Sequence, residues 1–126
     1  MEKIIISPPF SNLYISSMYP KVTRIAGTYT LHKRKGFWKA LSTINKTDRG
    51  WVNNLGLRNR GVQTAPDARI IISISGLHDG DWIEMLNILA ERDNIIGVEL
   101  NISCPNAKVL KIDYRALELA NSLFDY

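Results

Sequence analysis

The chain has 126 residues, of which 45% are hydrophobic and 22% are charged, and its formal net charge is +4. This composition is typical of a globular protein and excludes a disordered chain, and no run reaches the ~18 apolar residues that a membrane-spanning helix needs. One cysteine excludes a disulfide framework and a cysteine-based metal site, and because the first residues do not resemble a signal peptide we expect a soluble, cytoplasmic protein without a membrane partner.

Two segments near the N-terminus have the composition of strands. Residues 3–7 are rich in isoleucine and predict a short buried strand that ends at Pro8 and Pro9, because proline cannot donate to a sheet ladder. Residues 22–31 are rich in Val, Ile, Thr and Tyr and predict a second strand. Residues 11–20 lack a helical period, which predicts a short or irregular connection between the two strands.

Residues 32–50 are charged and aperiodic, so we predict a long loop. The loop contains the densest basic cluster of the chain, which consists of Lys33, Arg34, Lys35 and Lys39. The positive charge suits an anionic ligand such as a phosphate or a carboxylate, but we interpret the cluster itself as a solvated loop. A nucleic-acid surface needs more charge and aromatic platforms on one face. We therefore predict no nucleic-acid partner, although Phe37 and Trp38 within the cluster leave that alternative open.

The second half of the chain contains one predicted βαβ unit. Residues 69–75 include three consecutive isoleucines, which favour a strand that is covered on both faces, as in a parallel sheet. Asp81 as N-cap and Glu84 at the capping-box position predict the start of a helix, and Asn94 predicts its end. Residues 95–102 form the next predicted strand. The apolar face of the helix follows the i, i+3, i+4, i+7 pattern and consists of Trp82, Met85, Leu86 and Leu89.

A last helix is predicted close to the C-terminus. Asp113 is the expected N-cap, and Ile112 and Leu117 are spaced as a hydrophobic staple. The expected apolar stripe of this helix consists of Ala116, Leu117, Ala120 and Phe124. The two histidines, His32 and His78, do not form a spaced ligand pair, so we predict no metal site.

The most informative motif follows the strand at residues 95–102. It reads Asn-Ile-Ser-Cys-Pro-Asn and extends from Asn101 to Asn106. In parallel α/β folds the reactive groups lie at the carboxyl ends of the strands, where this motif puts Cys104 and two carboxamides. Taken alone, a single cysteine is more often a small buried hydrophobic residue, and a single asparagine is more often a turn residue.

This motif resembles the active-site loop of the dihydroorotate dehydrogenase family. Four further segments resemble that family, in the same order and along nearly the whole chain. They are the first strand with its turn (residues 4–10), the second strand with the following loop (27–36), the substrate loop (51–59) and the third strand (71–76). The pieces Asn-x-Ser-Cys-Pro-Asn and Asn-x-x-Gly-Leu-x-Asn are the specific ones, and together the segments identify the chain as a member of the family.

The resemblance implies an FMN-dependent oxidoreductase that oxidises dihydroorotate to orotate in pyrimidine biosynthesis. It implies that Cys104 is the catalytic base, as in the soluble-type branch that uses cysteine rather than serine. The residues implied for substrate binding are Asn53, Leu55, Gly56, Leu57, Asn101 and Asn106, and those implied for FMN binding are Ser7, Gly27, Thr28 and Asn101. Gly27 departs from the family pattern, because the soluble branch usually has a lysine there.

The family fold is a (β/α)8 TIM barrel, which typically needs about 250 residues, whereas this sequence has four plausible barrel strands. We therefore expect α/β class and one partial domain, residues 1–126, equal to the N-terminal half of a barrel with its second half, including the phosphate loops, absent. Activity would then need a second chain that supplies the missing half, or a homo-oligomer. The alternatives are a non-catalytic split or truncated half-barrel that acts as an assembly subunit, and an enzyme similar to dihydropyrimidine dehydrogenase, which shares the Ser-Cys-Pro-Asn loop.

Overall fold

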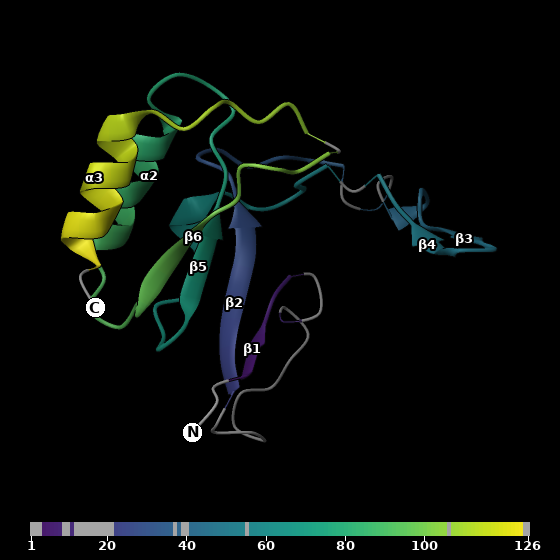
Figure 1. The fold of residues 1–126 in the computed structure, drawn as a ribbon, viewed down its shortest axis with the longest axis horizontal. Helices are drawn as coiled ribbons and strands as arrows, with labels where there is room; N and C mark the ends of the chain where they lie inside the picture. The colour runs from purple at the N-terminus through teal and green to yellow at the C-terminus, as the bar shows by residue number, and fades with distance from the viewer. Residues whose placement is uncertain are drawn as a thin grey trace.

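The computed structural model of the chain describes residues 4–8, 11, 22–36, 38, 41–54, 56–105 and 107–124. Figure 1 shows a β-sheet with two helices on one side and a separate hairpin on the other. The elements are, in chain order, β1 (Ile4–Ile6), β2 (Val22–Tyr29), β3 (Asn45–Thr47), β4 (Gly50–Val52), the 3-10 helix η3 (Val62–Thr64), β5 (Ile71–Ile74), α2 (Asp81–Ala90), β6 (Gly97–Leu100) and α3 (Tyr114–Leu123).

Four of the strands form one parallel sheet in the order β1-β2-β5-β6. α2 and α3 lie side by side on one face of this sheet, and no helix of the described residues covers the other face (Figure 1). The chain is therefore an α/β protein, as predicted. β1 pairs with β2, β2 with β5 and β5 with β6, so the strands lie in the sheet in the same order as in the chain. The first four strands of a (β/α)8 barrel have this order.

The core lies between the sheet and α2. The predicted apolar face of this helix is confirmed, because Trp82, Met85, Leu86 and Leu89 are all buried. Ile72 and Ile74 of β5 are fully buried against them and belong to the same cluster. Side chains alternate between the two faces of a strand, so Ser73 points to the face of the sheet opposite the helices.

The prediction that Asp81 is the N-cap of α2 is wrong. The N-cap is Gly80, which has φ 83°, and Asp81 is the first helical residue. Its carboxylate instead accepts hydrogen bonds from the backbone N–H groups of Leu77 and His78, at 2.9 and 3.0 Å. The Asp81 carboxylate therefore bonds to the loop before α2, and not to the first turn of the helix as the capping pattern predicted. The helix also ends at Ala90, four residues before Asn94.

The start of α3 is confirmed, whereas part of its apolar stripe is wrong. The Asp113 side chain accepts hydrogen bonds from the N–H groups of Arg115 and Ala116, as an N-cap does. Ala116 is buried, but Leu117 is 44% exposed and is not part of the buried stripe. The helix is rotated so that Leu119 packs against the core in its place, together with Ala120 and Phe124.

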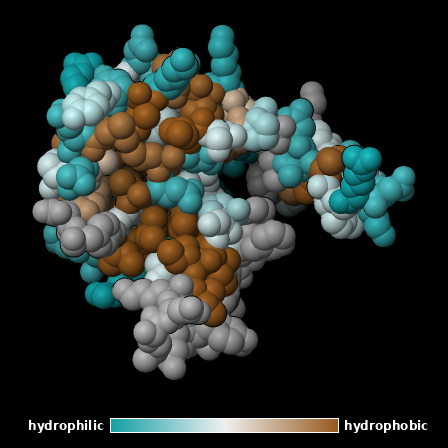
Figure 2. Space-filling model, in the orientation of Figure 1, coloured by the Kyte–Doolittle hydropathy of each residue, from teal (hydrophilic) through white to brown (hydrophobic). Residues whose placement is uncertain are grey.

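β1 forms where it was predicted, but it is not buried. Ile4 and Ile5 are 61% and 54% exposed, because β1 is an edge strand that pairs only with β2 among the described residues. Figure 2 shows apolar residues at the surface over the sheet and down to β1, bordered by hydrophilic residues. The structure therefore leaves the apolar β1 edge, and the face of the sheet opposite the helices, without cover from the described part of the chain.

The predicted loop at residues 32–50 contains secondary structure that the sequence did not predict. β3 and β4 pair antiparallel through a tight turn and form a hairpin that projects away from the sheet (Figure 1). Gly50 has φ 131°, a conformation that only glycine adopts readily and that ends the turn. The hairpin is exposed throughout, including Trp51 and Val52, so no hydrophobic alternation was present to reveal it.

Candidate functional site

Polar side chains from three adjacent strands meet near the carboxyl ends of the sheet, on the face opposite the helices. The Asn101 Nδ2 group lies 3.0 Å from Thr28 Oγ1, which lies 2.9 Å from Ser73 Oγ. Ser73 Oγ in turn donates to Glu99 Oε1 at 2.6 Å. These four residues, here called the polar relay, connect the residue after β6 with β2, β5 and β6.

The direction of the hydrogen bonds in the polar relay follows from its two ends. The Ser73 hydroxyl hydrogen is used by Glu99, so Ser73 must accept from the Thr28 hydroxyl. Thr28 must then accept from the Asn101 amide. This fixes the orientation of the Asn101 carboxamide, whose Oδ1 accepts from the Ser103 N–H at 3.4 Å. One amide hydrogen and one lone pair of Asn101 remain available for a ligand.

A β-bulge brings Thr28 into the relay. The register between β2 and β5 shifts between Ala26 and Tyr29, where three residues of β2 oppose two of β5. Ala26 and Tyr29 both pack towards the core as a result, and Thr28 turns to the opposite face. Gly27 has φ 134°, and a Cβ on it would lie 2.5 Å from the Ser73 carbonyl oxygen. The bulge therefore requires glycine at this position.

The loop that carries Cys104 is anchored at both ends. β6 ends at Leu100, earlier than predicted, and the Asn101 N–H and C=O groups bond to the Ile74 carbonyl (2.9 Å) and the Ser75 hydroxyl (2.7 Å). The loop returns at Leu110, whose N–H donates to the Gly76 carbonyl at 3.0 Å. Cys104 lies between these anchors and is half-buried. Its position after the sheet is thus fixed by the ends of β5 and β6.

The predicted substrate loop lies between β4 and η3. Asn53 is exposed, and Gly56 and Leu57 both have positive φ, at 60° and 58°. A positive φ is costly for leucine, which marks this turn as constrained by its surroundings. Leu55 and Asn106, which were also predicted to contact the substrate, lie outside the described residues.

Only some of the predicted site residues are brought together. Asn101 and Thr28 are in direct contact, and Gly27 is packed beside Ser73. Ser7 is exposed after β1, and its carbonyl accepts from the Ser11 N–H at 3.2 Å, so its known contact is local. Among the described residues, no hydrogen bond links the loop of Asn53 to Cys104.

Sequence reasoning missed Ser73 and Glu99. Both are polar residues inside otherwise apolar strands, and the register pairs them directly across β5 and β6. A matched pair of polar positions in two buried strands was the signal that could have revealed them, since buried polar groups need partners.

At the end of β2, burial raises the pKa of the Tyr29 phenol above its ordinary value, and the nearby Arg24 and Arg92 charges oppose this rise.

The donor set at this edge fits the ring of a flavin. Its pyrimidine edge alternates carbonyl and N–H groups, and Asn101 keeps one amide hydrogen and one lone pair to match such an edge, whereas the Thr28 hydroxyl hydrogen is used within the polar relay. Within the described ranges, no three His, Cys, Asp or Glu side chains are grouped so that they could hold a metal ion. None of the helices in this part of the chain is long and apolar enough to cross a membrane.

Comparison with known proteins decides the family. The catalytic subunit of dihydroorotate dehydrogenase B (NAD(+)) from Bacteroides fragilis is 35% identical over 101 aligned positions, which cover 69% of this chain and 33% of the relative. The corresponding Bacteroides thetaiotaomicron subunit is 37% identical and covers 67% of this chain and 30% of the relative. The chain belongs to the dihydroorotate dehydrogenase family. The family resemblance of the sequence is thereby confirmed, and the four-stranded sheet is part of the TIM barrel of this family.

Other comparisons set the limits of this assignment. A putative dihydroorotate dehydrogenase A (fumarate) from Pediococcus pentosaceus is 34% identical and covers 51% of this chain and 25% of the relative. No family model matches the chain. The chain spans about a third of the length of the curated relatives it matches.

Proposed function

We propose that residues 1–126 form one partial barrel domain that supplies the substrate side of an FMN-dependent dihydroorotate dehydrogenase. The contact between Asn101 and Thr28 carries this proposal, because it joins a predicted substrate residue to a predicted flavin residue at the carboxyl edge of the sheet. The reaction would oxidise dihydroorotate to orotate in pyrimidine biosynthesis. Soluble, cytoplasmic location is part of the same proposal.

In this proposal Cys104 removes a proton from the dihydropyrimidine ring. A general base must lie within hydrogen-bond reach of its proton, and the anchored loop between Asn101 and Leu110 holds the thiol near the end of β6. Asn53, Asn101 and Asn106 would bind the ring through donor and acceptor pairs. Leu55, Gly56 and Leu57 would cover it.

The flavin side of the site would be formed by Ser7, Gly27, Thr28 and Asn101. FMN, when bound, accepts the hydride that leaves the substrate. The residues of this chain would orient the ring, and the polar relay would hold Asn101 in one orientation through Thr28. Glu99 at the end of the relay makes the Ser73 hydrogen bond charge-assisted and therefore stronger.

We propose that activity needs further barrel strands in addition to the four described here. A closed barrel of this family has eight strands, and β1 and β6 are the two edges of the described sheet. Unpaired edges accept strands from another chain. The remaining strands would come from residues outside this sequence, on the same or a second polypeptide, or from a second copy of this chain.

The experiment is complementation. The chain is co-expressed with the remaining segment of the Bacteroides fragilis catalytic subunit, and the purified complex is tested for yellow flavin absorbance and for orotate formation. We expect both. A complex that forms but stays colourless and inactive would contradict the proposal and support a non-catalytic assembly subunit.

The same complex tests the base and the substrate. Cys104→Ala should lower turnover by a factor of about 100 or more, the usual contribution of a general base, while flavin absorbance is retained. Ser103→Ala, an exposed neighbour, is the matched control and should keep activity. Turnover of dihydrouracil in preference to dihydroorotate would instead favour the enzyme similar to dihydropyrimidine dehydrogenase.

A further inference from the structure

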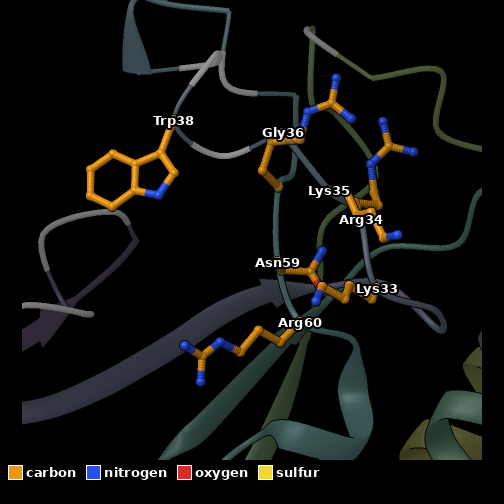
Figure 3. Close-up of a pocket in the computed structure, with 8 residues that line it drawn as sticks. Lys33, Arg34, Lys35, Gly36, Trp38, Asn59 and Arg60 are labelled. Carbon is orange, nitrogen blue, oxygen red and sulfur yellow. The ribbon is translucent and has the colours of Figure 1, made fainter.

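A basic cavity of about 660 Å³ lies between the segment after β2 and the segment before η3 (Figure 3). We call it the basic pocket. It is lined by Lys33, Arg34, Lys35, Gly36, Trp38, Arg58, Asn59 and Arg60. Five of these side chains are cations and none is acidic. The first three cations were predicted to be part of a solvated loop, but the structure joins them to two arginines that are more than twenty residues further along the chain.

One asparagine holds the two walls of the basic pocket together. The Asn59 Oδ1 atom accepts from the N–H groups of Thr30 (3.3 Å) and Gly61 (2.7 Å). Its Nδ2 group donates to Thr30 Oγ1 (2.9 Å) and to the Leu57 carbonyl (2.7 Å). The Asn59 carbonyl also accepts from the Arg34 N–H at 2.9 Å. The pocket is therefore built by specific contacts and not by two loops that happen to be adjacent.

Arg34 is oriented by the opposite wall. Its Nε group donates to the Gly56 carbonyl at 3.2 Å, which leaves the two terminal nitrogens directed away from that bond. A guanidinium held in this way can bind an oxyanion through two parallel hydrogen bonds. The loss of side-chain entropy on binding is smaller because the side chain is already ordered.

Among the described residues, neither the ion pair of His78 with Asp81 nor that of Arg115 with Asp113 involves a cation of the basic pocket. One carboxylate, Asp81, lines a neighbouring cavity together with Lys33 and Arg34. Gathering five cations in one pocket is unfavourable unless an anion binds there. An anion with several charges relieves this repulsion better than one with a single charge.

The basic pocket also has an aromatic side. Trp38 is 82% exposed, and Figure 3 shows its indole across the pocket from Lys33, Arg34 and Lys35. An exposed indole offers a flat surface on which a heterocyclic base can stack. The cavity volume is within the range of small-molecule sites, about 300–1,000 Å³.

We propose that the basic pocket binds a nucleoside di- or triphosphate, with its phosphates on the cations and its base on Trp38. The basic pocket adjoins the proposed flavin site, because Arg58, Asn59 and Arg60 also line a neighbouring cavity that includes Gly27. It borders the substrate loop, because Gly56 and Leu57 are the residues that Arg34 and Asn59 contact.

The test is equilibrium binding of ATP to the full chain by calorimetry, without FMN, substrate or divalent metal. We expect saturable binding that weakens about tenfold or more in the double variant Arg58→Gln/Arg60→Gln, because charge-assisted hydrogen bonds are lost. The double variant Lys46→Gln/Arg49→Gln on the hairpin removes the same charge outside the pocket and should change affinity less than about twofold. Circular dichroism establishes that each variant is folded.

Further probes test the ligand class. Inorganic tripolyphosphate should bind more weakly than ATP, and Trp38→Leu should remove that difference. Equal loss of ATP binding in the pocket and hairpin variants would overturn the proposal, as would tighter binding of a single-stranded RNA or displacement of ATP by an equal concentration of FMN. The second pocket pair Lys33→Gln/Lys35→Gln gives an independent measurement on exposed residues. Because no turnover is measured, failure here leaves the proposed dehydrogenase function untouched.

Discussion

Two runs of three isoleucines occur in this chain, and their environments are opposite. Ile4, Ile5 and Ile6 form an edge strand in which the first two side chains are exposed and the third is half-buried, whereas the run that starts at Ile70 leads into β5, at the centre of the sheet beneath α2. The composition of the two runs is identical, so the difference comes from their neighbours. β5 has a strand on each side and a helix above it, while β1 has one strand beside it among the described residues.

The contrast between β1 and β5 shows which part of the chain contributes most to its stability. Apolar burial stabilises a fold in proportion to the area removed from water, and that area is concentrated around β5 and α2. The β1 edge contributes little by itself. Its exposed isoleucines are suited to a further strand, in agreement with the proposed complementation.

The largest expected effect comes from removing a core side chain. Leu86→Ala should lower the free energy of unfolding by about 2–5 kcal/mol, because it leaves a cavity beneath α2. Ile5→Ala is the matched control at the exposed edge and should change it by less than about 0.5 kcal/mol. Urea unfolding of both variants measures the contrast, and similar losses would show that the edge is buried in solution.

A second contrast uses glycines. Gly27→Ala should destabilise the chain by about 1–3 kcal/mol, since the new Cβ would overlap the Ser73 carbonyl in the bulge. Gly36→Ala also lies at positive φ but meets open space, so its cost should be limited to about 1 kcal/mol. Thermal unfolding compares them, and equal costs would contradict the close packing of β2 on β5.

The polar relay offers an effect of similar size to that of Gly27→Ala. Ser73→Ala removes the donor to Glu99 and the acceptor for Thr28, and should cost about 1–3 kcal/mol in unfolding free energy. The side-chain amide signals of Asn101 in an NMR spectrum should shift as its orientation is released. Exposed Ser103→Ala is the control for stability. Unchanged Asn101 signals in Ser73→Ala would mean that the relay does not orient the carboxamide.

The smallest effect is expected at the surface cap of α3. The hydrogen bond from the Arg115 side chain lowers the pKa of Asp113, so the folded state binds its proton less readily than the unfolded state. The stabilising contribution is present above the unfolded-state pKa and is lost as the pH falls through the lowered folded-state pKa. Asp113→Ala should therefore lower the Tm at neutral pH but not at strongly acidic pH. Asp113→Asn keeps an oxygen that accepts the hydrogen bonds of the cap. The Tm of this variant should no longer change with pH through the titration of residue 113.

The elements that the sequence predicted are those with a strong hydrophobic period. The apolar face of α2 and the strand around β5 were correct because burial and period agree there. The hairpin was missed because its strands are exposed, and Leu117 was misassigned because two neighbouring stripes on α3 were both apolar. Local patterns do not specify which of two similar faces meets the core.

The candidate site was predicted mainly from the family motifs, and only partly from the predicted positions of the strand ends. The resemblance implied binding roles for Asn101 and Thr28, and the structure joins these two side chains by a hydrogen bond that the motifs did not predict. The bulge that turns Thr28 to the site depends on the fit of Gly27 against β5, a contact between residues 46 positions apart that sequence order does not reveal. The basic pocket was hidden for the same reason, because Arg58 and Arg60 reach the cluster only through the folding of the intervening segment.

The four side-chain hydrogen bonds of Asn59 have a consequence for local opening of the structure. Thr30 bonds to Asn59 through both its N–H and its hydroxyl group, and Gly61 donates to the same amide oxygen, so the segment of Thr30 separates from that of Asn59 only when both Thr30 bonds break. Their backbone amides should therefore exchange with deuterium at similar rates, as one cooperative unit. Leu57, which has a positive φ, belongs to the same unit because its carbonyl accepts from the same side chain.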